Sequence, residues 1–211
     1  MLHTKTRFPP SPTGFLHIGS LRTALFNYLV AKKNGGSFVL RIEDTDRERF
    51  VEGGVENIIQ TLHWAGLQVD EGPYLKEDGT IAQKGECGPY IQSQRLDIYK
   101  THVQKLLEQG NAYYCFCSKE RLDELRSTQQ EAKEPTGYDG HCRDLTKEAL
   151  QEHMRSNTSF VIRLRAPKEG KTTFTDAVLG DITFDNSTVD DQVLVKADRF
   201  PTYHLAVVVD D

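Results

Sequence analysis

The sequence predicts an α/β fold with a parallel sheet, and two features carry that prediction. Before Gly66, two short apolar runs alternate with two segments of helical periodicity. This order of strand, helix, strand and helix is typical of an α/β layer, whose ligands bind beyond the carboxyl ends of the strands. A loop rich in proline and glycine follows the first apolar run, at the place where such a ligand would lie.

The first strand, loop and helix are read from residues 4–36. Residues 4–8 alternate weakly in polarity, and the prolines and glycine of residues 9–14 exclude a helix or a central strand there. Apolar residues then recur at three- and four-residue spacing over residues 17–33, and an Asn-Gly-Gly stop follows. We expect a strand, an exposed loop and a helix in this order.

The rest of the chain changes character near residue 113. Up to that point we expect a second strand and helix, an exposed connection without regular structure, and a third helix, at residues 37–42, 55–64, 67–89 and 94–109. Beyond it we expect a partly β segment, with strands at residues 160–165, 172–174, 181–184 and 193–195, and then a helix or strand at residues 201–209. The predicted domains are a main domain in residues 1–112, an inserted subdomain in 113–190 and a return to the main domain in 191–211.

Composition places the chain among ordinary folded proteins. Hydrophobic residues make up 37% and charged residues 27% of its 211 residues, which argues against wholesale disorder. No apolar run approaches the ~18 residues of a spanning helix. The first seven residues leave no room for a secretory or transit segment, so we expect a cytoplasmic protein without a membrane partner.

The charge is unevenly distributed along the chain. The net charge of −5 argues against non-specific coating of nucleic acid. Residues 1–50 nevertheless hold eight Lys and Arg against four Asp and Glu, whereas the remainder is acidic. We therefore expect anionic ligands to bind the first segment.

The loop and the helix that follows it have the composition of a phosphate site. Free backbone N–H groups and the positive end of a helix beginning near His17 would face an anion. Gly19 permits close approach, and His17 can donate a hydrogen bond to a phosphate oxygen without carrying a full charge. For a His-x-Gly motif alone, a capped helix with an incidental histidine would be the preferred interpretation. The longer string from Arg7 to Ser20 favours the phosphate site.

Several strings in this sequence resemble those of class I glutamyl-tRNA synthetases. They are Pro-Ser-Pro-Thr-Gly-x-Leu-His-Ile-Gly at residues 10–19, Arg-Thr-Ala-Leu-Phe-Asn at 22–27, Arg-Ile-Glu-Asp-Thr-Asp at 41–46, and shorter matches at 88–95, 138–140, 201–204 and 208–211. The resemblance covers essentially the whole chain. It implies the N-terminal half of a Rossmann-like class I synthetase catalytic domain with an inserted, zinc-binding-like subdomain. Ser20 stands where the family's signature usually has a second histidine.

The resemblance also implies two sets of binding residues. ATP would be bound, together with Mg²⁺, by Pro12, Thr13, Gly14, His17, Gly19 and Ser20, of which His17 and Gly19 serve catalysis. Glutamate would be bound by Arg7, Ser11, Glu43, Tyr203 and Val207. The chemistry agrees, since a guanidinium suits a carboxylate and Glu43 suits an ammonium group. Val207 departs from the asparagine of some members, and a surface ion pair is the alternative interpretation of Arg7 and Glu43.

Three of the four cysteines indicate a structural zinc site. Cys115, Cys117 and Cys142 could close a tetrahedral site with one further ligand. Some family members carry a histidine where this chain has Asp144, which makes Asp144 the predicted fourth ligand, with Tyr138 and His141 as alternatives. Thiols that are merely small buried residues are the other interpretation. Cys87, which belongs to no motif, is expected to be incidental.

A basic stretch could contact RNA. The residues are Arg163, Arg165, Lys168 and Lys171. They could approach the acceptor end of a tRNA, although alternating charges on an edge strand are more often simply solvated.

The activity implied by the resemblance is ligation of L-glutamate to tRNA(Glu) through glutamyl-adenylate, by a full-length enzyme expected to be a monomer. A glutamyl-queuosine tRNA(Asp) synthetase and a non-catalytic zinc- and RNA-binding fragment are the alternatives. Class I synthetases also use a Lys-Met-Ser-Lys-Ser loop, and these 211 residues contain no such string. We therefore expect the chain alone to bind ATP weakly and not to complete aminoacylation.

Overall fold

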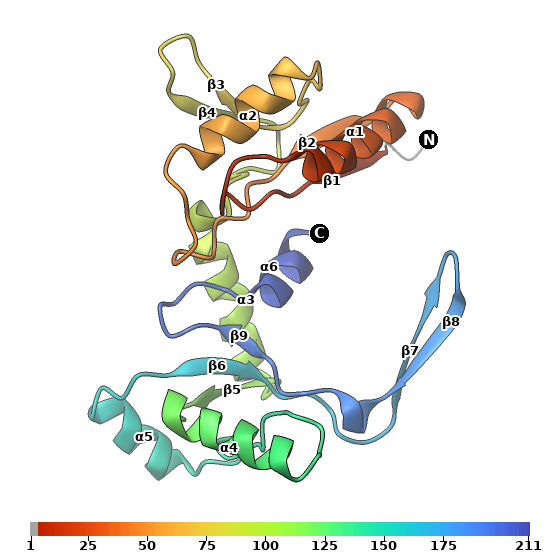
Figure 1. Ribbon diagram of the computed structural model, residues 1–211. Coiled ribbons are helices and arrows are strands. Elements are labelled where there is room, and N and C mark those ends of the chain that lie inside the picture. Colours follow the sequence, from red (N-terminus) through yellow and green to blue (C-terminus); the bar gives the residue numbers. More distant parts are fainter. Residues whose placement is uncertain (1–3) are drawn as a thin grey trace. The chain divides into compact units, whose positions relative to one another are not determined.

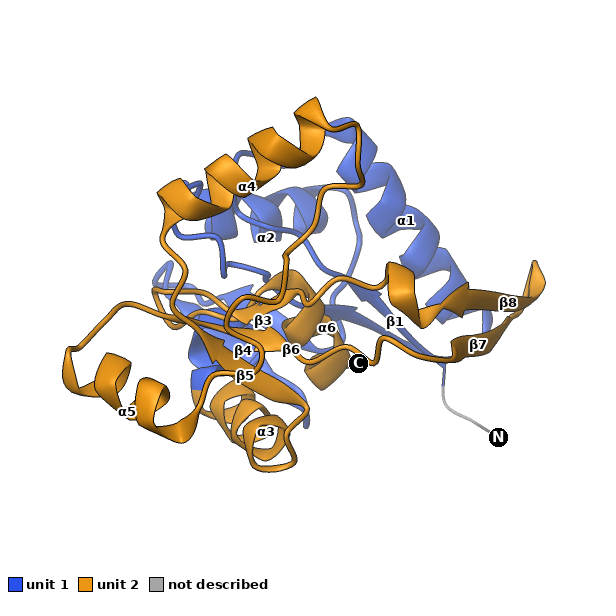
Figure 2. Ribbon diagram, turned by 90° about the horizontal axis from the view of Figure 1, so that it is seen from below, with its two compact units in different colours: residues 1–96 blue, residues 97–211 orange. Residues whose placement is uncertain are grey.

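The computed structural model describes residues 4–211, which form two compact units (Figures 1 and 2). The first unit ends at Leu96 and the second begins at Asp97. Among the described residues, no helix has both the length and the apolar character needed to cross a bilayer.

The first unit is built on a parallel pair of strands joined by a helix. Strand β1 (Lys5–Phe8) pairs in parallel with β2 (Ser37–Leu40), and α1 (Ile18–Lys33) connects them and packs on both (Figure 1). Helix α2 (Gly54–Trp64) follows. Parallel bridges continue the layer, from Val39 to Glu71 and from Ile42 to Ile91. The predicted order and the parallel pairing are confirmed.

The core of this unit lies between the strands and the two helices. Phe38, Leu40 and Ile42 are fully buried beneath α1 and α2, and Tyr28 of α1 meets the Phe38 ring edge-on with centroids 5.6 Å apart. From α2, Ile58 and Leu62 enter the same cluster at four-residue spacing. This packing fixes where β1 and β2 end, and therefore where the loops beyond them begin.

One half-buried carboxylate ties the connection after α2 to the sheet. Asp70 accepts hydrogen bonds from the Lys32 ammonium group at 2.7 and 2.8 Å and from the Phe38 amide at 2.7 Å. Burial of the carboxyl group opposes its ionisation, but the hydrogen bonds from Lys32 and Phe38 outweigh that effect and lower the pKa of Asp70.

The connection predicted for residues 67–89 is not irregular, and that expectation was wrong. It contains an antiparallel hairpin of β3 (Gly72–Leu75) and β4 (Ile81–Lys84). Each strand has only four residues, which is too short for a clear alternation of polarity. The short helix η1 (Gln92–Gln94) then leads out of the unit.

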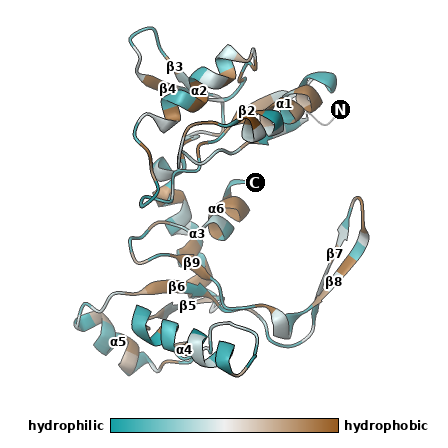
Figure 3. Ribbon diagram, viewed as in Figure 1, coloured by the Kyte–Doolittle hydropathy of each residue, from teal (hydrophilic) through white to brown (hydrophobic). Residues whose placement is uncertain are grey.

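The second unit is organised by a three-stranded antiparallel sheet. Helix α3 (Leu96–Glu108) leads into β5 (Ala112–Cys115), which pairs with β6 (Val161–Leu164), and β6 pairs with β9 (Val193–Val195). Two helices between β5 and β6, α4 (Lys119–Glu131) and α5 (Lys147–Arg155), were not predicted. No residue of either helix is buried. Helix α4 is hydrophilic along most of its length (Figure 3), so no clear apolar stripe marked it. Helix α5 does have apolar residues on one side, Ala149, Leu150 and Met154, but it has only nine residues, too few for a clear period.

The unit closes with a hairpin and a helix. Strands β7 (Lys171–Asp176) and β8 (Gly180–Asp185) form a hairpin at two of the predicted strands, and η2 (Asn186–Thr188) follows. Helix α6 (Tyr203–Asp210) lies in the segment for which the sequence predicted either a helix or a strand. The Tyr99 hydroxyl of α3 donates to Asp210 at 2.8 Å and anchors α6.

Candidate active site

The loop between β1 and α1 borders a cavity of about 400 Å³. Its lining includes six residues predicted from the sequence or next to them in the motif: Ser11, Thr13, Gly14, His17, Ser20 and Thr23. Pro12 is buried, whereas Ser11, Thr13 and His17 on either side of it are exposed. The prolines therefore anchor the loop, and its polar side chains remain accessible to a ligand.

Backbone hydrogen bonds hold this loop against the rest of the first unit. The Glu43 amide donates to the Pro10 carbonyl at 3.0 Å, and the Val51 amide donates to the Pro12 carbonyl at 2.9 Å. The Leu16 amide donates to the Asn57 side chain at 2.9 Å. The loop is thus fixed to both the end of β2 and to α2, which suits a site that must be formed before its ligand arrives.

His17 is the N-cap of α1. Its backbone is extended, at φ −98° and ψ 165°, and its ring lies back over the first turn of the helix. The Gly19 amide donates to Nδ1 at 3.1 Å, and the Ser20 hydroxyl lies 3.1 Å from Nε2. The structure therefore brings together His17, Gly19 and Ser20, three of the residues assigned to ATP.

Two glycines are assigned to ATP, and neighbouring atoms would crowd a Cβ atom at only one of them. A Cβ atom on Gly19 would lie 2.9 Å from Cε1 of His17, closer than such contacts normally occur. A Cβ atom on Gly14 would meet nothing within 4 Å. Nothing in the structure explains the glycine at position 14.

A second cluster lies at the carboxyl ends of β1 and β2. Nη1 of Arg7 is 3.7 Å from Oε1 of Glu43, and Nη2 of Arg41 is 2.8 Å from the same oxygen. Arg41 and Glu43 are buried, whereas the Arg7 side chain is 28% exposed. A surface ion pair therefore does not describe this cluster. Arg41 is the member that sequence reasoning missed, because its direction depends on how β2 leaves the sheet.

The remaining predicted glutamate ligands lie in different places. Ser11 is in the loop beside the cavity. Tyr203 and Val207 belong to α6 of the second unit, with Tyr203 59% exposed and Val207 partly buried. Their roles toward glutamate stay predictions.

The three predicted cysteines lie together in the second unit. Their Sγ atoms are all within 4.8 Å of one another, with Cys117 and Cys142 3.6 Å apart. The Tyr138 hydroxyl lies 3.3 Å from the Cys115 sulfur and 3.4 Å from the Cys117 sulfur, and it accepts a hydrogen bond from the Cys142 amide at 2.9 Å. Three thiols at these distances can supply three of the four ligands of a structural zinc ion, and the Tyr138 oxygen lies beside two of them. Burial and the hydrogen bonds with Cys115 and Cys117 raise the pKa of Tyr138, so this oxygen would act as a neutral donor.

The structure favours Tyr138 over Asp144 as the fourth donor. The Asp144 carboxylate accepts from Arg165 at 2.8 Å, and its side chain is 83% exposed. Asp144 is therefore engaged elsewhere and does not belong to the sulfur cluster. His141 is exposed and also lies outside the cluster. The sequence pattern favoured Asp144 because this residue occupies the family's ligand position. In the structure the Tyr138 hydroxyl lies beside the thiols, and the Asp144 carboxylate bonds Arg165.

The thiols do not share one electrostatic environment. Burial raises the pKa of the Cys117 thiol to about 12, and Cys115 and Cys142 act in the same direction. Burial also opposes ionisation of Cys115, but hydrogen bonds from Tyr138, the Cys117 amide and Arg163 outweigh it and lower the pKa of that thiol. A thiol must lose its proton to bind a metal ion. A bound cation would therefore favour the thiolate form of Cys117, against the effect of burial.

The basic residues considered for RNA contact are mostly engaged within the protein. Arg163 is buried, stacks 3.8 Å above the Tyr138 ring and donates to the Asp191 carbonyl at 2.9 Å. Lys168 lies 3.2 Å from the Asp191 carboxylate, and Arg165 bonds Asp144. The Arg163 side chain therefore does not lie on a solvated edge strand, because β6 is the central strand of its sheet. Contact between RNA and the remaining basic residues stays a prediction.

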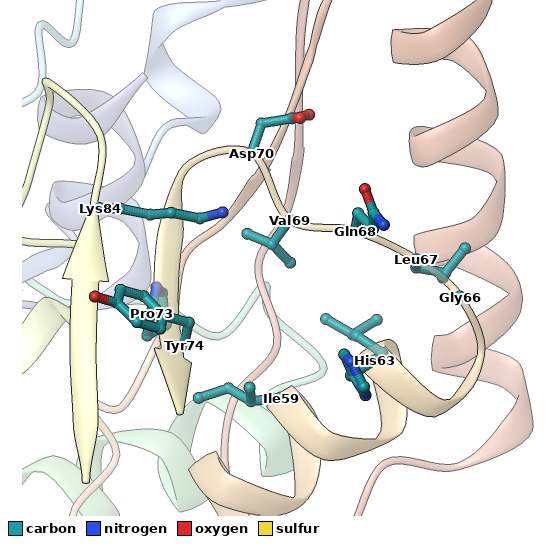
Figure 4. Close-up of a pocket in the computed structure, with 11 residues that line it drawn as sticks. Ile59, His63, Gly66, Leu67, Gln68, Val69, Asp70, Pro73, Tyr74 and Lys84 are labelled. Atoms are coloured by element: carbon teal, nitrogen blue, oxygen red, sulfur yellow. The ribbon is translucent and has the colours of Figure 1, made fainter. Parts of the chain in front are cut away.

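A second cavity of about 340 Å³ lies between the end of α2 and the β3–β4 hairpin. Figure 4 shows Tyr74 and Lys84 of the hairpin on one side and His63 of α2 on the other. None of the residues predicted for a site lines this cavity.

The fold and the loop define the class of protein. A polar loop that begins at the carboxyl end of one parallel strand and ends at the N-terminus of the following helix is the nucleotide-binding arrangement of α/β enzymes. The family model for class I tRNA synthetases (E and Q), catalytic domain, matches residues 3–211. The chain belongs to this family.

Two curated relatives are glutamate–tRNA ligases. Those of Clostridioides difficile (strain 630) and Alkaliphilus metalliredigens (strain QYMF) are each 56% identical to this chain over its whole length, which spans 43% of theirs. A crystal structure of a glutamate tRNA ligase from Elizabethkingia meningosepticum CCUG26117, in complex with its amino acid, superposes with a TM-score of 0.86 at 39% identity. That match covers 99% of this chain and 41% of the other.

Proposed function

We propose that this chain carries the ATP- and glutamate-binding elements of a glutamate–tRNA ligase. The observation that carries the proposal is the juxtaposition, within the first unit, of the capped loop around His17 and the Arg7–Arg41–Glu43 cluster, both at the carboxyl ends of β1 and β2. The names of the relatives support glutamate as the amino acid. Because the chain spans about two fifths of those relatives, the activity is proposed for the protein that contains it.

The proposed reaction has two steps. A carboxylate oxygen of glutamate attacks the α-phosphorus of ATP, forming glutamyl-adenylate and releasing pyrophosphate, with Mg²⁺ bound to the nucleotide. A ribose hydroxyl at the end of tRNA(Glu) then attacks the activated carbonyl and releases AMP. No covalent bond to the protein is needed, so the residues act by positioning and by stabilising charge.

In this proposal each group of residues has one role. The loop residues Pro12, Thr13 and Gly14 shape the nucleotide site, and His17, Gly19 and Ser20 meet its phosphates. Arg7 pairs with a carboxylate of glutamate through its planar guanidinium group, and Ser11 adds a hydrogen bond. Arg41 holds Glu43 in a fixed position, from which Glu43 accepts from the substrate ammonium group.

We further propose that Cys115, Cys117, Cys142 and Tyr138 hold a structural zinc ion. The ion would stabilise the second unit rather than take part in the chemistry.

Charging of defined tRNAs tests the proposed function. The protein that contains this chain is incubated with labelled glutamate, ATP and Mg²⁺, and with tRNA(Glu) or tRNA(Asp) in separate reactions. We expect an alkali-labile ester on tRNA(Glu) only. Label on tRNA(Asp) would instead indicate a glutamyl-queuosine synthetase, and no label on either would indicate a non-catalytic module. Both results contradict the proposal.

A further inference from the structure

The cavity between α2, the connection that follows it and the β3–β4 hairpin has the features of a second binding site (Figure 4). Its volume of about 340 Å³ is within the range of small-molecule sites. Ile58 and Ile59 are neighbours on α2, yet Ile58 lines the cavity beside the loop around His17, whereas Ile59 lines this one. Helix α2 therefore borders both cavities, and each cavity has its own isoleucine.

The floor of this second cavity is apolar and fixed. Leu62 and Leu67 are buried in the core of the first unit, and Val69 packs against the same core. Pro73 of the hairpin is also buried. Side chains in a close-packed core have little freedom to rearrange, so this floor is formed before any ligand binds.

The wall of the cavity carries one uncompensated positive charge. Lys84 is the only lysine or arginine among the described residues that line the cavity, and its side chain extends from β4 toward the connection (Figure 4). Asp70, the only acidic residue of the lining, bonds Lys32 and the Phe38 amide. Lys84 is close enough to lower the pKa of Asp70 through its charge, but within residues 4–211 it forms no ion pair. Two ammonium groups thus share one carboxylate, which leaves one positive charge for a ligand.

We propose that this cavity binds a small aromatic molecule with a single carboxylate group. The carboxylate pairs with Lys84, and the aromatic ring lies on the apolar floor. Tyr74 of the hairpin and His63 of α2 offer flat faces to that ring from opposite sides (Figure 4). The inference is independent of the proposed function, because none of the residues assigned to ATP or glutamate lines the cavity.

The end of α2 at this cavity favours a single negative charge over a phosphate. His63 of the lining lies in the last turn of α2. The carboxyl end of a helix carries a partial negative charge, whereas phosphate sites use the free amides of the opposite end. A multiply charged ligand would meet this negative end and only one lysine.

NMR of the isoleucine methyl groups locates the ligand. The protein that contains this chain is labelled at its isoleucines and titrated with 4-fluorobenzoate, and the two signals are assigned from Ile58→Val and Ile59→Val. We expect the Ile59 signal to move and the Ile58 signal to stay, with a millimolar dissociation constant, which is ordinary for so small a probe. The matched probe 4-fluorobenzylamine has the same ring and the opposite charge, and it should move neither signal. A stationary Ile59 signal, or equal movement with both probes, would overturn the inference.

A pair of lysine substitutions tests the recognition of the carboxylate. We expect Lys84→Met to weaken 4-fluorobenzoate binding by ~10-fold or more, the usual effect of losing a hydrogen bond to a charged group. Lys76→Met removes the same charge from an exposed position on the same hairpin, outside the cavity, and should change nothing. Arg7→Ala should also leave the Ile59 titration unchanged, because the probe does not need the proposed glutamate site. Unchanged binding in Lys84→Met, equal losses in the two lysine variants, or loss of the Ile59 shift in Arg7→Ala would each contradict the site.

Discussion

Arg41 bonds the carboxylate of Glu43 at 2.8 Å, and both residues are buried. The pair lies where β2 leaves the sheet, and Arg7 approaches the same oxygen from β1. A buried charge without its partner is strongly destabilising. The position of Glu43, and through it the proposed site for the substrate ammonium group, therefore depends on Arg41.

Replacing Arg41 should destabilise the protein measurably. We expect Arg41→Met to lower the free energy of unfolding by about 3–5 kcal/mol, because Glu43 would remain buried and charged. Adding Glu43→Gln should recover part of that loss. Arg49→Ala is the control, since its pair with Asp46 is exposed and worth about 0–1 kcal/mol. Urea denaturation measures all three, and equal effects of Arg41→Met and Arg49→Ala would refute the dependence.

Arg7 should recognise glutamate rather than ATP. We expect Arg7→Ala to weaken glutamate binding by ~10²- to 10⁴-fold, since a site built to pair with a charged group rejects a mismatch strongly. ATP binding should change little. Lys5→Ala on the same strand is the control, because Lys5 pairs with Glu71 and belongs to no proposed site. Calorimetry with each ligand gives the comparison, and equal losses for both ligands would rule out the assignment.

The sulfur cluster should bind one zinc ion per chain. We expect Tyr138→Phe to weaken zinc binding by ~10-fold or more. Loss of a residue that only hydrogen-bonds to a metal ligand already has an effect of this size, and loss of a ligand should have at least the same effect. Asp144→Ala should leave it unchanged, because Asp144 bonds Arg165. Competition with a chromogenic chelator measures the affinities. Protein purified without chelator that contains well under one equivalent of zinc would disprove the site, and weaker binding in Asp144→Ala alone would reverse the choice of ligand.

The lowered pKa of Asp70 predicts a pH-dependent contribution to stability. An acid with a lowered folded-state pKa stabilises the fold above its unfolded pKa, near 4, and loses that effect as pH falls through the folded value. We expect Asp70→Asn to cost about 1 kcal/mol at pH 7, allowing for solvent screening of this partly exposed pair. The difference should disappear at strongly acidic pH. Urea denaturation across pH tests it, and a difference independent of pH would contradict the ionic contribution.

The first unit was largely predictable from sequence because its signals are local. The prolines of the loop and the spacing of apolar residues in α1 mark a strand, a loop and a helix without reference to the rest of the chain. The β3–β4 hairpin was not predicted because strands of four residues are too short to show a clear alternation of polar and apolar residues. Helix α4 was missed because it buries no residue, although its Ser118 cap and its many helix-forming residues could have suggested it.

The sites were predictable as sets of residues but not as contacts. The cysteines were found from their spacing, whereas the choice between Tyr138 and Asp144 depends on a turn that brings the phenol against the thiols. Arg163 was expected to be exposed, but it packs on Tyr138 inside the second unit. Such contacts form between segments distant in sequence, which local patterns do not specify.

Amino-acid-dependent pyrophosphate exchange tests the central claim most directly. The protein that contains this chain is assayed with ATP, Mg²⁺, tRNA(Glu) and, in turn, glutamate, glutamine or aspartate. We predict exchange with glutamate alone, and a loss of ~10²- to 10³-fold in His17→Ala, because we propose that the loop around His17 binds the phosphates. Exchange that is equally fast in His17→Ala, or that is supported by glutamine as well as by glutamate, would contradict the account.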